Sequence, residues 1–118
     1  SHDPDIMERL TNYFEKKLTL LDEKGVKDVI LDPGFGFSKT MDENYELLHR
    51  MDELHIFRKP LLVGISRKSM IYKKLGITPE ESLNGTTALN TLAVLKGAGI
   101  LRVHDVNACR EIIDLLCS

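Results

Sequence analysis

Polar side chains that could bind a ligand follow three short apolar stretches of the sequence. Asp32 ends the first stretch, and Ser66 and Lys68 follow the second. Arg102 and His104 end the third, and a cation beside an imidazole suits phosphate or pyrophosphate oxygens. If the stretches are parallel strands, their C-terminal ends meet at one edge, which is where α/β proteins bind ligands. The sequence therefore predicts one anion-binding site at that edge.

Each of these residues also has an ordinary structural interpretation, which the sequence leaves open. Asp32 precedes a Pro-Gly pair, so it could cap a turn or accept paired N–H donors from a heterocycle. Arg102 could pair with a structural carboxylate, and His104 could cap a turn. The convergence of Lys68 on the same edge favours the anion site.

Two aromatic residues lie in the glycine-containing loop that follows Asp32. The loop could bring Phe35 or Phe37 over a planar ligand, while the other ring packs into the core.

The stretch PLLVGISRKS, residues 60–69, conflicts with a local rule. A helix is expected from about Ser66 to a cap at Gly76. Arg67 and Lys68 would then lie in its first turn, where the helix dipole disfavours cations. Such conflicts often mark functional sites, so the stretch raises the question of what these two cations serve.

Helices and strands are expected to alternate along the chain, as parallel βα units. The expected strands are residues 28–32, 61–65 and 100–104. Five helices are expected. They open at Asp3, with Pro4 in the first position, at Thr40, near Ser66, at Thr78 and at Asp105. The helix from Asp3 should end near Gly25, the helix from Thr40 near Leu54 and the helix from Thr78 near Lys96.

Side chains of the last strand should alternate between two faces. Arg102 and His104 would share one face with Ile100 and point into the mouth of a barrel, whereas Leu101 and Val103 would pack on helices.

Composition indicates one ordinary globular domain, residues 1–118, with 42% apolar and 29% charged residues. The net charge of -2 and the absence of a basic tract argue against nucleic acid and anionic membranes as partners. No apolar run approaches the roughly 20 residues that span a bilayer, and the start resembles no secretory signal, so a cytoplasmic location is expected. Cys109 and Cys117 lie eight residues apart in one expected helix and are predicted to be reduced.

Three strands are too few for a closed barrel, since a (β/α)₈ barrel typically needs about 250 residues. The motifs ILDPGFGFSKT, PLLVGISRKS and GILRVHDV closely resemble the last three strand-end motifs of the dihydropteroate synthase family of folate biosynthesis. The resemblance implies an α/β fold, namely the C-terminal part of a TIM barrel: its last three βα units and the preceding helix.

The family condenses 6-hydroxymethyl-7,8-dihydropterin pyrophosphate with p-aminobenzoate and releases pyrophosphate. By resemblance, Asp32 holds the amino-pyrimidine edge of the pterin, Arg67 stacks over the pterin, and Gly64 belongs to the substrate site. Lys68 contacts the pterin and borders the aminobenzoate pocket, which Phe37 lines, with Ser66 near the aminobenzoate carboxylate. Arg102 and His104 bind the departing pyrophosphate, and with Lys68 they are the expected catalytic residues.

The resemblance also implies Mg²⁺ as cofactor, with its main protein ligand outside this chain, and a homodimer or larger assembly. An inner face with Ile30, Val63 and Ile100 would lack the opposite barrel wall, which favours association. The chain alone is expected to be inactive. Two alternatives stay open: another pterin-binding barrel, such as a methyltetrahydrofolate-dependent methyltransferase, and a non-catalytic half-barrel fragment.

Overall fold

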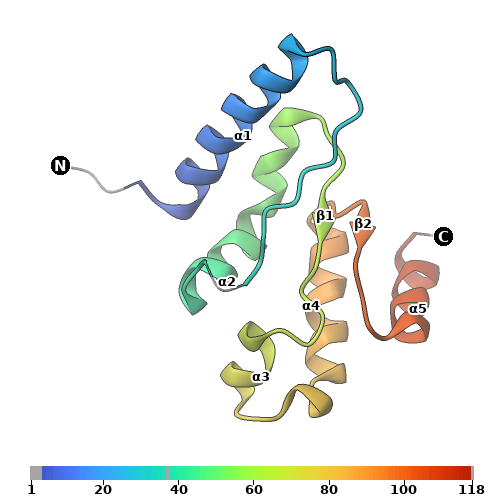
Figure 1. Cartoon of the computed structure of the whole chain (residues 1–118). Coiled ribbons are helices and arrows are strands. Elements are labelled where there is room, and N and C mark those ends of the chain that lie inside the picture. The colour runs from blue at the N-terminus through green and yellow to red at the C-terminus, as the bar shows by residue number, and fades with distance from the viewer. Residues whose placement is uncertain (1–3, 37, 118) are drawn as a thin grey trace.

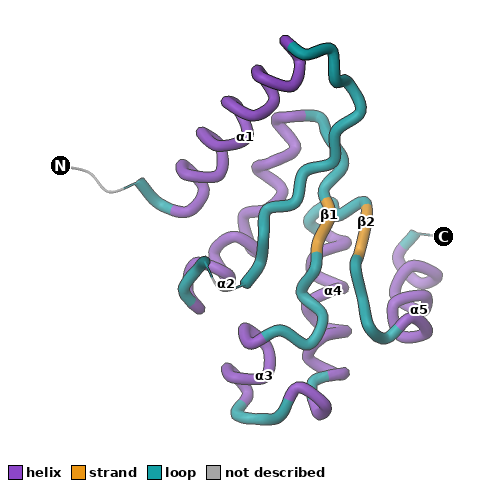
Figure 2. The backbone as a smooth tube through the Cα atoms, in the orientation of Figure 1, coloured by secondary structure: helices purple, strands orange, loops and turns teal. Residues whose placement is uncertain are grey.

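A computed structural model describes residues 4–36 and 38–117 as a mostly helical α/β structure with two short parallel strands (Figures 1 and 2). The helices are α1 (Ile6–Glu23), α2 (Met41–Arg50), α3 (Ser69–Leu75), α4 (Leu83–Leu95) and α5 (Val106–Leu116). Two 3₁₀ helices, η1 (Met51–Phe57) and η2 (Pro79–Glu81), and the strands β1 (Leu62–Val63) and β2 (Ile100–Leu101) complete the described elements.

The sheet is parallel, as predicted, but it is shorter than predicted. Leu62 pairs with Ile100 in β1 and β2, whereas the segment 28–32 contributes only an isolated parallel bridge from Leu31 to Leu61. The expectation of three full strands is therefore wrong. Pro33 and Pro60 have no backbone N–H, so the ladder cannot extend past the bridge on either side.

The first helix begins later than predicted. Asp5 is the N-cap, and its carboxylate accepts a hydrogen bond of 2.8 Å from the Glu8 amide, so Pro4 lies outside the helix. Asp3, the predicted cap, lies outside the described residues. The predicted end is confirmed, because Gly25 follows the helix with a φ of 79°.

The helix predicted to begin near Ser66 begins at Ser69 instead. Lys68 is its N-cap residue, and Arg67 precedes it with a left-handed φ of 54°. The two cations therefore lie in a turn before the helix and not in its first turn. Gly76 ends the helix with a φ of 69°, as predicted.

The capping boxes predicted at Thr40 and Thr78 are both present. The second one opens η2 rather than the long helix, which begins only at Leu83. The amide and the hydroxyl of Ser82 both donate to the Pro79 carbonyl and close a single tight turn. This turn separates η2 from α4.

The core lies between the sheet and the helices. Its fully buried members include Leu47, Leu48, Met51, Leu54, Leu61, Val63 and Ile65. The expectation that Val63 lies on the open inner face is therefore wrong, because the β1 side chain on that face is Leu62, which pairs with Ile100. Ile30 and Ile100 do lie on the open side, with 53% and 36% of their surfaces exposed.

The chain forms a thin layer. It measures 44 × 40 × 19 Å, and its radius of gyration of 15.2 Å exceeds the value of about 13.5 Å expected for a compact domain of this length. Figure 1 shows α5 next to α4, with the start of α1 and the end of α5 on opposite sides. None of the described helices has the length and apolar character needed to cross a membrane.

Candidate functional site

The ends of β1 and β2 place five predicted site residues around one small pocket. The amide of Arg102 donates to the Val63 carbonyl at 3.0 Å, so the parallel register continues beyond the strands. The pocket has a volume of about 140 Å³, and its lining consists of Gly64, Ser66, Lys68, Arg102, Val103 and His104. The structure thus brings Gly64, Ser66, Lys68, Arg102 and His104 together; we call this hollow the anion pocket.

Ser66 and His104 form the best-defined contact of the anion pocket. The Ser66 Oγ lies 2.8 Å from His104 Nδ1 and accepts a hydrogen bond of 3.2 Å from the His104 amide. Ser66 is 5% exposed, so its hydroxyl is held in place. If the hydroxyl donates to Nδ1, the proton of a neutral imidazole lies on Nε2, where it can be donated to an anion.

The Lys68 ammonium group connects the anion pocket to the loop that follows Asp32. Its Nζ donates to the Phe35 carbonyl at 2.6 Å. Burial lowers the pKa of Lys68 below its usual value, and the charge of Arg102 lowers it further. An anion bound beside Lys68 would therefore relieve an unfavourable charge.

Gly64 makes room for Arg102. A Cβ at position 64 would lie 2.6 Å from Nη2 of Arg102, so the guanidinium group can rest over the strand only because this residue is glycine. The same guanidinium lies 3.9 Å from Oδ2 of Asp32, measured from Nη1. The ends of β1 and β2 and the segment that ends at Asp32 therefore meet at Arg102.

Asp32 is positioned for both of the roles that the sequence left open, namely capping a turn and accepting hydrogen bonds from a ligand. Its Oδ1 accepts a hydrogen bond of 2.9 Å from the Gly34 amide, which is the turn-capping arrangement. Its Oδ2 faces Arg102 instead. One carboxylate oxygen thus holds the loop while the other lies at the edge of the site.

The loop after Asp32 is fixed by α2. The Asn44 amide is buried, accepts from the Gly36 amide at 3.1 Å and donates to the Thr40 carbonyl at 3.2 Å. Phe35 packs into the core, as expected for one of the two aromatic residues. Phe37 lies outside the described residues, so its predicted place beside a ligand stays a prediction.

A second polar pocket, of about 290 Å³, lies between this loop and α3. It is lined by Gly36, Lys39, Met41, Asn44, Ser69, Met70 and Lys73. Burial lowers the pKa of Lys39. Sequence reasoning missed Ser69 and Lys73, although SRKSMIYKK repeats a hydroxyl and cations at helical spacing.

Arg67 points away from the anion pocket and is tied by its guanidinium group. Its Nε and Nη2 donate to the two carboxylate oxygens of Asp105 at 2.9 and 2.8 Å. Its Nη1 donates to the carbonyls of Pro79 and Glu80 at 2.8 and 2.9 Å. The hydrogen bonds raise the pKa of Arg67 and lower that of Asp105.

The prediction that the Asp105 side chain caps the last helix is wrong. Asp105 precedes α5, but its side chain makes no capping hydrogen bond to the helix. The carboxylate is used by Arg67 instead, an ion pair that links the two motifs SRK and RVHD.

The described residues hold no cluster of three or more His, Cys, Asp or Glu side chains that could bind a metal ion. Near the anion pocket, Oδ1 of Asp32 accepts from the Gly34 amide, and Oδ2 lies 3.9 Å from Nη1 of Arg102. Because Mg²⁺ keeps several waters and usually needs only one or two carboxylates beside phosphate oxygens, a single main protein ligand outside this chain would be enough to hold it.

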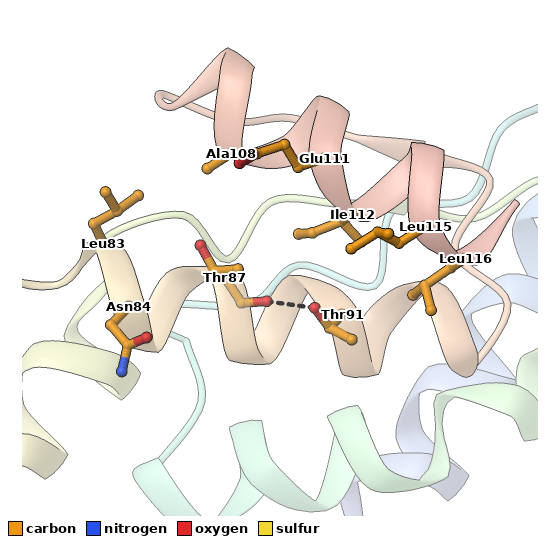
Figure 3. A pocket seen from close by; sticks show the side chains of 9 residues that line it. All are labelled: Leu83, Asn84, Thr87, Thr91, Ala108, Glu111, Ile112, Leu115 and Leu116. Atoms are coloured by element: carbon orange, nitrogen blue, oxygen red, sulfur yellow. Dashed lines mark hydrogen bonds between the residues drawn. The ribbon is translucent and has the colours of Figure 1, made fainter.

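A larger hollow lies elsewhere, between α4 and α5 (Figure 3). It has a volume of about 500 Å³, and its lining is Leu83, Asn84, Thr87, Thr91, Ala108, Glu111, Ile112, Leu115 and Leu116. The lining contains no cation, and its dominant side chains are apolar. The groove therefore lacks the chemistry of the anion pocket despite its greater volume.

Comparisons with known proteins identify the family. Residues 1–104 match the family described as pterin binding enzyme. The dihydropteroate synthase of Escherichia coli K12 is 44% identical over 109 residues, which cover 91% of this chain and 39% of that protein. This chain thus spans about two fifths of the length of that curated relative.

Solved structures agree with the sequence comparison. The crystal structure of the Yersinia pestis dihydropteroate synthase matches with a TM-score of 0.92 at 38% identity, over 97% of this chain and 48% of that one. A Thermus thermophilus dihydropteroate synthase in complex with 4-aminobenzoate matches with a TM-score of 0.89 at 38% identity, over 97% and 45% of the two chains. The chain described here therefore belongs to the pterin-binding enzyme family and corresponds to part of the domain found in its dihydropteroate synthase relatives.

Proposed function

We propose that this chain forms the pyrophosphate-binding part of a dihydropteroate synthase active site. The complete enzyme would join 6-hydroxymethyl-7,8-dihydropterin pyrophosphate to p-aminobenzoate and release pyrophosphate. The observation that carries the proposal is the anion pocket, in which Lys68, Arg102 and the Ser66–His104 pair converge within a member of the pterin-binding family. The chain would be the last three βα units of a TIM barrel and the helix before them.

The proposed chemistry explains why cations gather at this point. When the C–O bond to the pyrophosphate breaks, negative charge develops on the leaving group, and fixed cations stabilise it. Arg102 and Lys68 supply the charge, and His104 supplies a hydrogen-bond donor. Bound Mg²⁺ would neutralise further pyrophosphate charge, with its main protein ligand outside this sequence.

The pterin would lie between Asp32 and Lys68. The Oδ2 of Asp32 is the oxygen available to the amino-pyrimidine edge, because Oδ1 holds Gly34. The hydrogen bonds of Arg67 use the edge of its guanidinium group and leave the planar faces for stacking.

The second substrate would lie on the other side of Lys68, beside the loop that carries Phe37. The Thermus thermophilus relative was solved with 4-aminobenzoate, which supports this substrate class. The Ser66 hydroxyl, which was expected to bind the carboxylate of the aminobenzoate, is engaged by His104. Ser69 and Lys73 in the second pocket would bind that carboxylate instead. Ser66 then serves the anion pocket rather than the aminobenzoate.

Two other functions remain as competing hypotheses. A methyltetrahydrofolate-dependent methyltransferase would share the pterin pocket but would not need the Arg102–His104 pair. A non-catalytic fragment is favoured by the partial length of the chain, which we expect to be inactive alone. We also keep the predictions of a homodimer or larger assembly and of a cytoplasmic location.

The test is dihydropteroate formation by the complete polypeptide that carries these residues. Lys68→Ala and Arg102→Ala should each lower kcat/KM by more than about tenfold, a change of about 1.4 kcal/mol. Lys16→Ala on α1 and Arg110→Ala on α5 remove exposed cations and serve as controls. A loss of less than tenfold in both site variants would reject the assignment, and product formation by residues 1–118 alone would reject the expected inactivity.

A further inference from the structure

The turn of residues 65–68 holds a side chain in a backbone conformation that suits glycine. The amide of Lys68 donates to the Ile65 carbonyl at 3.0 Å and closes the turn, so Arg67 occupies its third position. Arg67 has a φ of 54°, and glycine or asparagine is usual at such a position. An arginine is strained there, so contacts from outside the turn must hold it.

Thr86 supplies the first of these contacts, from α4. Its Oγ1 accepts a hydrogen bond of 3.1 Å from the backbone amide of Arg67. Thr86 is 2% exposed, and its own amide donates to the Ser82 carbonyl at 2.8 Å in the first turn of α4. The hydroxyl is therefore fixed, and without it the Arg67 amide would lose its partner.

Asp105 supplies the second contact, from the residue before α5. Its carboxylate accepts two hydrogen bonds from the Arg67 guanidinium, at 2.9 and 2.8 Å. This ion pair is largely shielded, since 23% of the Arg67 side chain and 25% of the Asp105 side chain are exposed. It pins the back of the turn to the segment that carries His104.

The front of the same turn faces the anion pocket. Ser66 precedes Arg67 and touches His104, which precedes Asp105. Lys68 follows Arg67 and reaches the Phe35 carbonyl. Two contacts thus join the same two segments: the Arg67–Asp105 pair behind the pocket and the Ser66–His104 pair in front of it. The ion pair behind the pocket therefore sets the distance between Ser66 and His104.

We propose that Thr86 and Asp105 are positioning residues that act through Arg67 to fix the turn presenting Ser66 and Lys68 to the bound anion. The identification of that anion as pyrophosphate rests on the proposed function. The positioning itself rests only on the contacts of residues 65–68.

The test uses residues 1–118 with two readouts: the dissociation constant for inorganic pyrophosphate by calorimetry, and the ¹⁵N shifts of the His104 ring in the free protein. Thr86→Val removes the first contact, and Asp105→Asn removes the charge and one of the two accepting oxygens of the second, both with little change in shape. Thr86→Ser keeps the hydroxyl, and Thr87→Val is the control one position along α4, where no side-chain hydrogen bond is lost. All variants are compared below their unfolding temperatures.

We expect Thr86→Val and Asp105→Asn to weaken pyrophosphate binding by about tenfold, the scale of one lost hydrogen bond to a charged or buried group. Both should also move the His104 ring shifts, because the bond to Ser66 loosens. Thr86→Ser and Thr87→Val should match the wild type in both readouts.

The proposal is overturned if Thr86→Val leaves the His104 shifts at their wild-type values, or if Thr86→Ser changes them as much as Thr86→Val does. Failure of the proposed function looks different. In that case the wild type itself would bind no pyrophosphate, while the His104 shifts would still report whether Thr86 and Asp105 position the turn.

Discussion

Two arginines of this chain share an uncommon backbone conformation but differ in everything around it. Arg58 has a φ of 55° at the end of η1, where its amide donates to the His55 carbonyl at 3.0 Å and its side chain is exposed. Arg67 has a φ of 54°, but four guanidinium hydrogen bonds and the Thr86 hydroxyl hold it. Backbone strain alone therefore does not mark the site; strain that other segments hold in place does.

Glycine at each of the two positions should separate these cases most strongly. Glycine adopts the left-handed conformation freely, so Arg67→Gly keeps the turn but loses its attachment to Asp105. We expect pyrophosphate binding to weaken by at least about tenfold. Arg58→Gly removes the same charge far from the pocket and should leave binding unchanged.

Stability measurements provide the second half of that comparison. For Arg58→Gly, relief of strain offsets the greater entropy of the unfolded chain, so the free energy of unfolding should stay within about 1 kcal/mol of the wild type. Chemical denaturation checks this value. Equal effects of Arg58→Gly and Arg67→Gly on binding would show that the contacts of Arg67 are irrelevant.

A pair of glycines tests the front of the pocket in the same way. A Cβ at position 64 would meet the end of the exposed Arg102 side chain at 2.6 Å, whereas one at position 85 would meet Ile71 Cγ2 at the same distance. Gly64→Ala should therefore weaken pyrophosphate binding several-fold with little loss of stability. Gly85→Ala should lower the unfolding temperature without changing the affinity of the folded protein. The reverse pattern would contradict the placement of Arg102.

The smallest expected effect is a dependence on alkaline pH. The pKa of Lys68 is lowered from 10.5 by burial and by Arg102, so the folded chain releases this proton at a lower pH than the unfolded chain does. Between the two pKa values the unfolded chain binds more protons, and the contribution of Lys68 to the free energy of unfolding therefore rises with pH. Pyrophosphate binding needs the charged form and should weaken over the same range.

Lys68→Met is the control for this pH dependence, because it removes the titrating group but leaves the ionisation of pyrophosphate itself unchanged. The difference between the wild-type and Lys68→Met affinity profiles should shrink as pH approaches 10.5. A difference that stays constant would mean that Lys68 does not contact the anion.

Local sequence signals predicted much of the fold. The capping boxes at Thr40 and Thr78 and the helix ends at Gly25 and Gly76 depend on residues close in sequence, and all four are present. The alternation of side chains between two faces also depends only on neighbouring residues. The prediction that Arg102 lies on the same open face as Ile100 was therefore correct. The family and the convergence of the strand ends followed from motifs in fixed order.

Features that depend on distant contacts could not be predicted. The left-handed conformation of Arg67 requires Thr86 and Asp105, which lie 19 and 38 residues further along the chain. The face of Val63 was assigned wrongly because LLVGI is apolar almost throughout and has no alternation to read. An aspartate that caps a helix and one that pairs with a distant arginine cannot be distinguished from the local sequence. The role of Asp105 was predicted wrongly for this reason.

The most direct test of the account is a calorimetric titration of this chain with inorganic pyrophosphate. The wild type should bind saturably in the millimolar range or tighter, Lys68→Ala and Arg102→Ala should each weaken that binding by at least about tenfold, and the exposed-site control Arg110→Ala should retain it. No saturable heat with the wild type at millimolar pyrophosphate, or equal binding by all four proteins, would contradict the assignment of residues 64–68 and 102–104 as the pyrophosphate site.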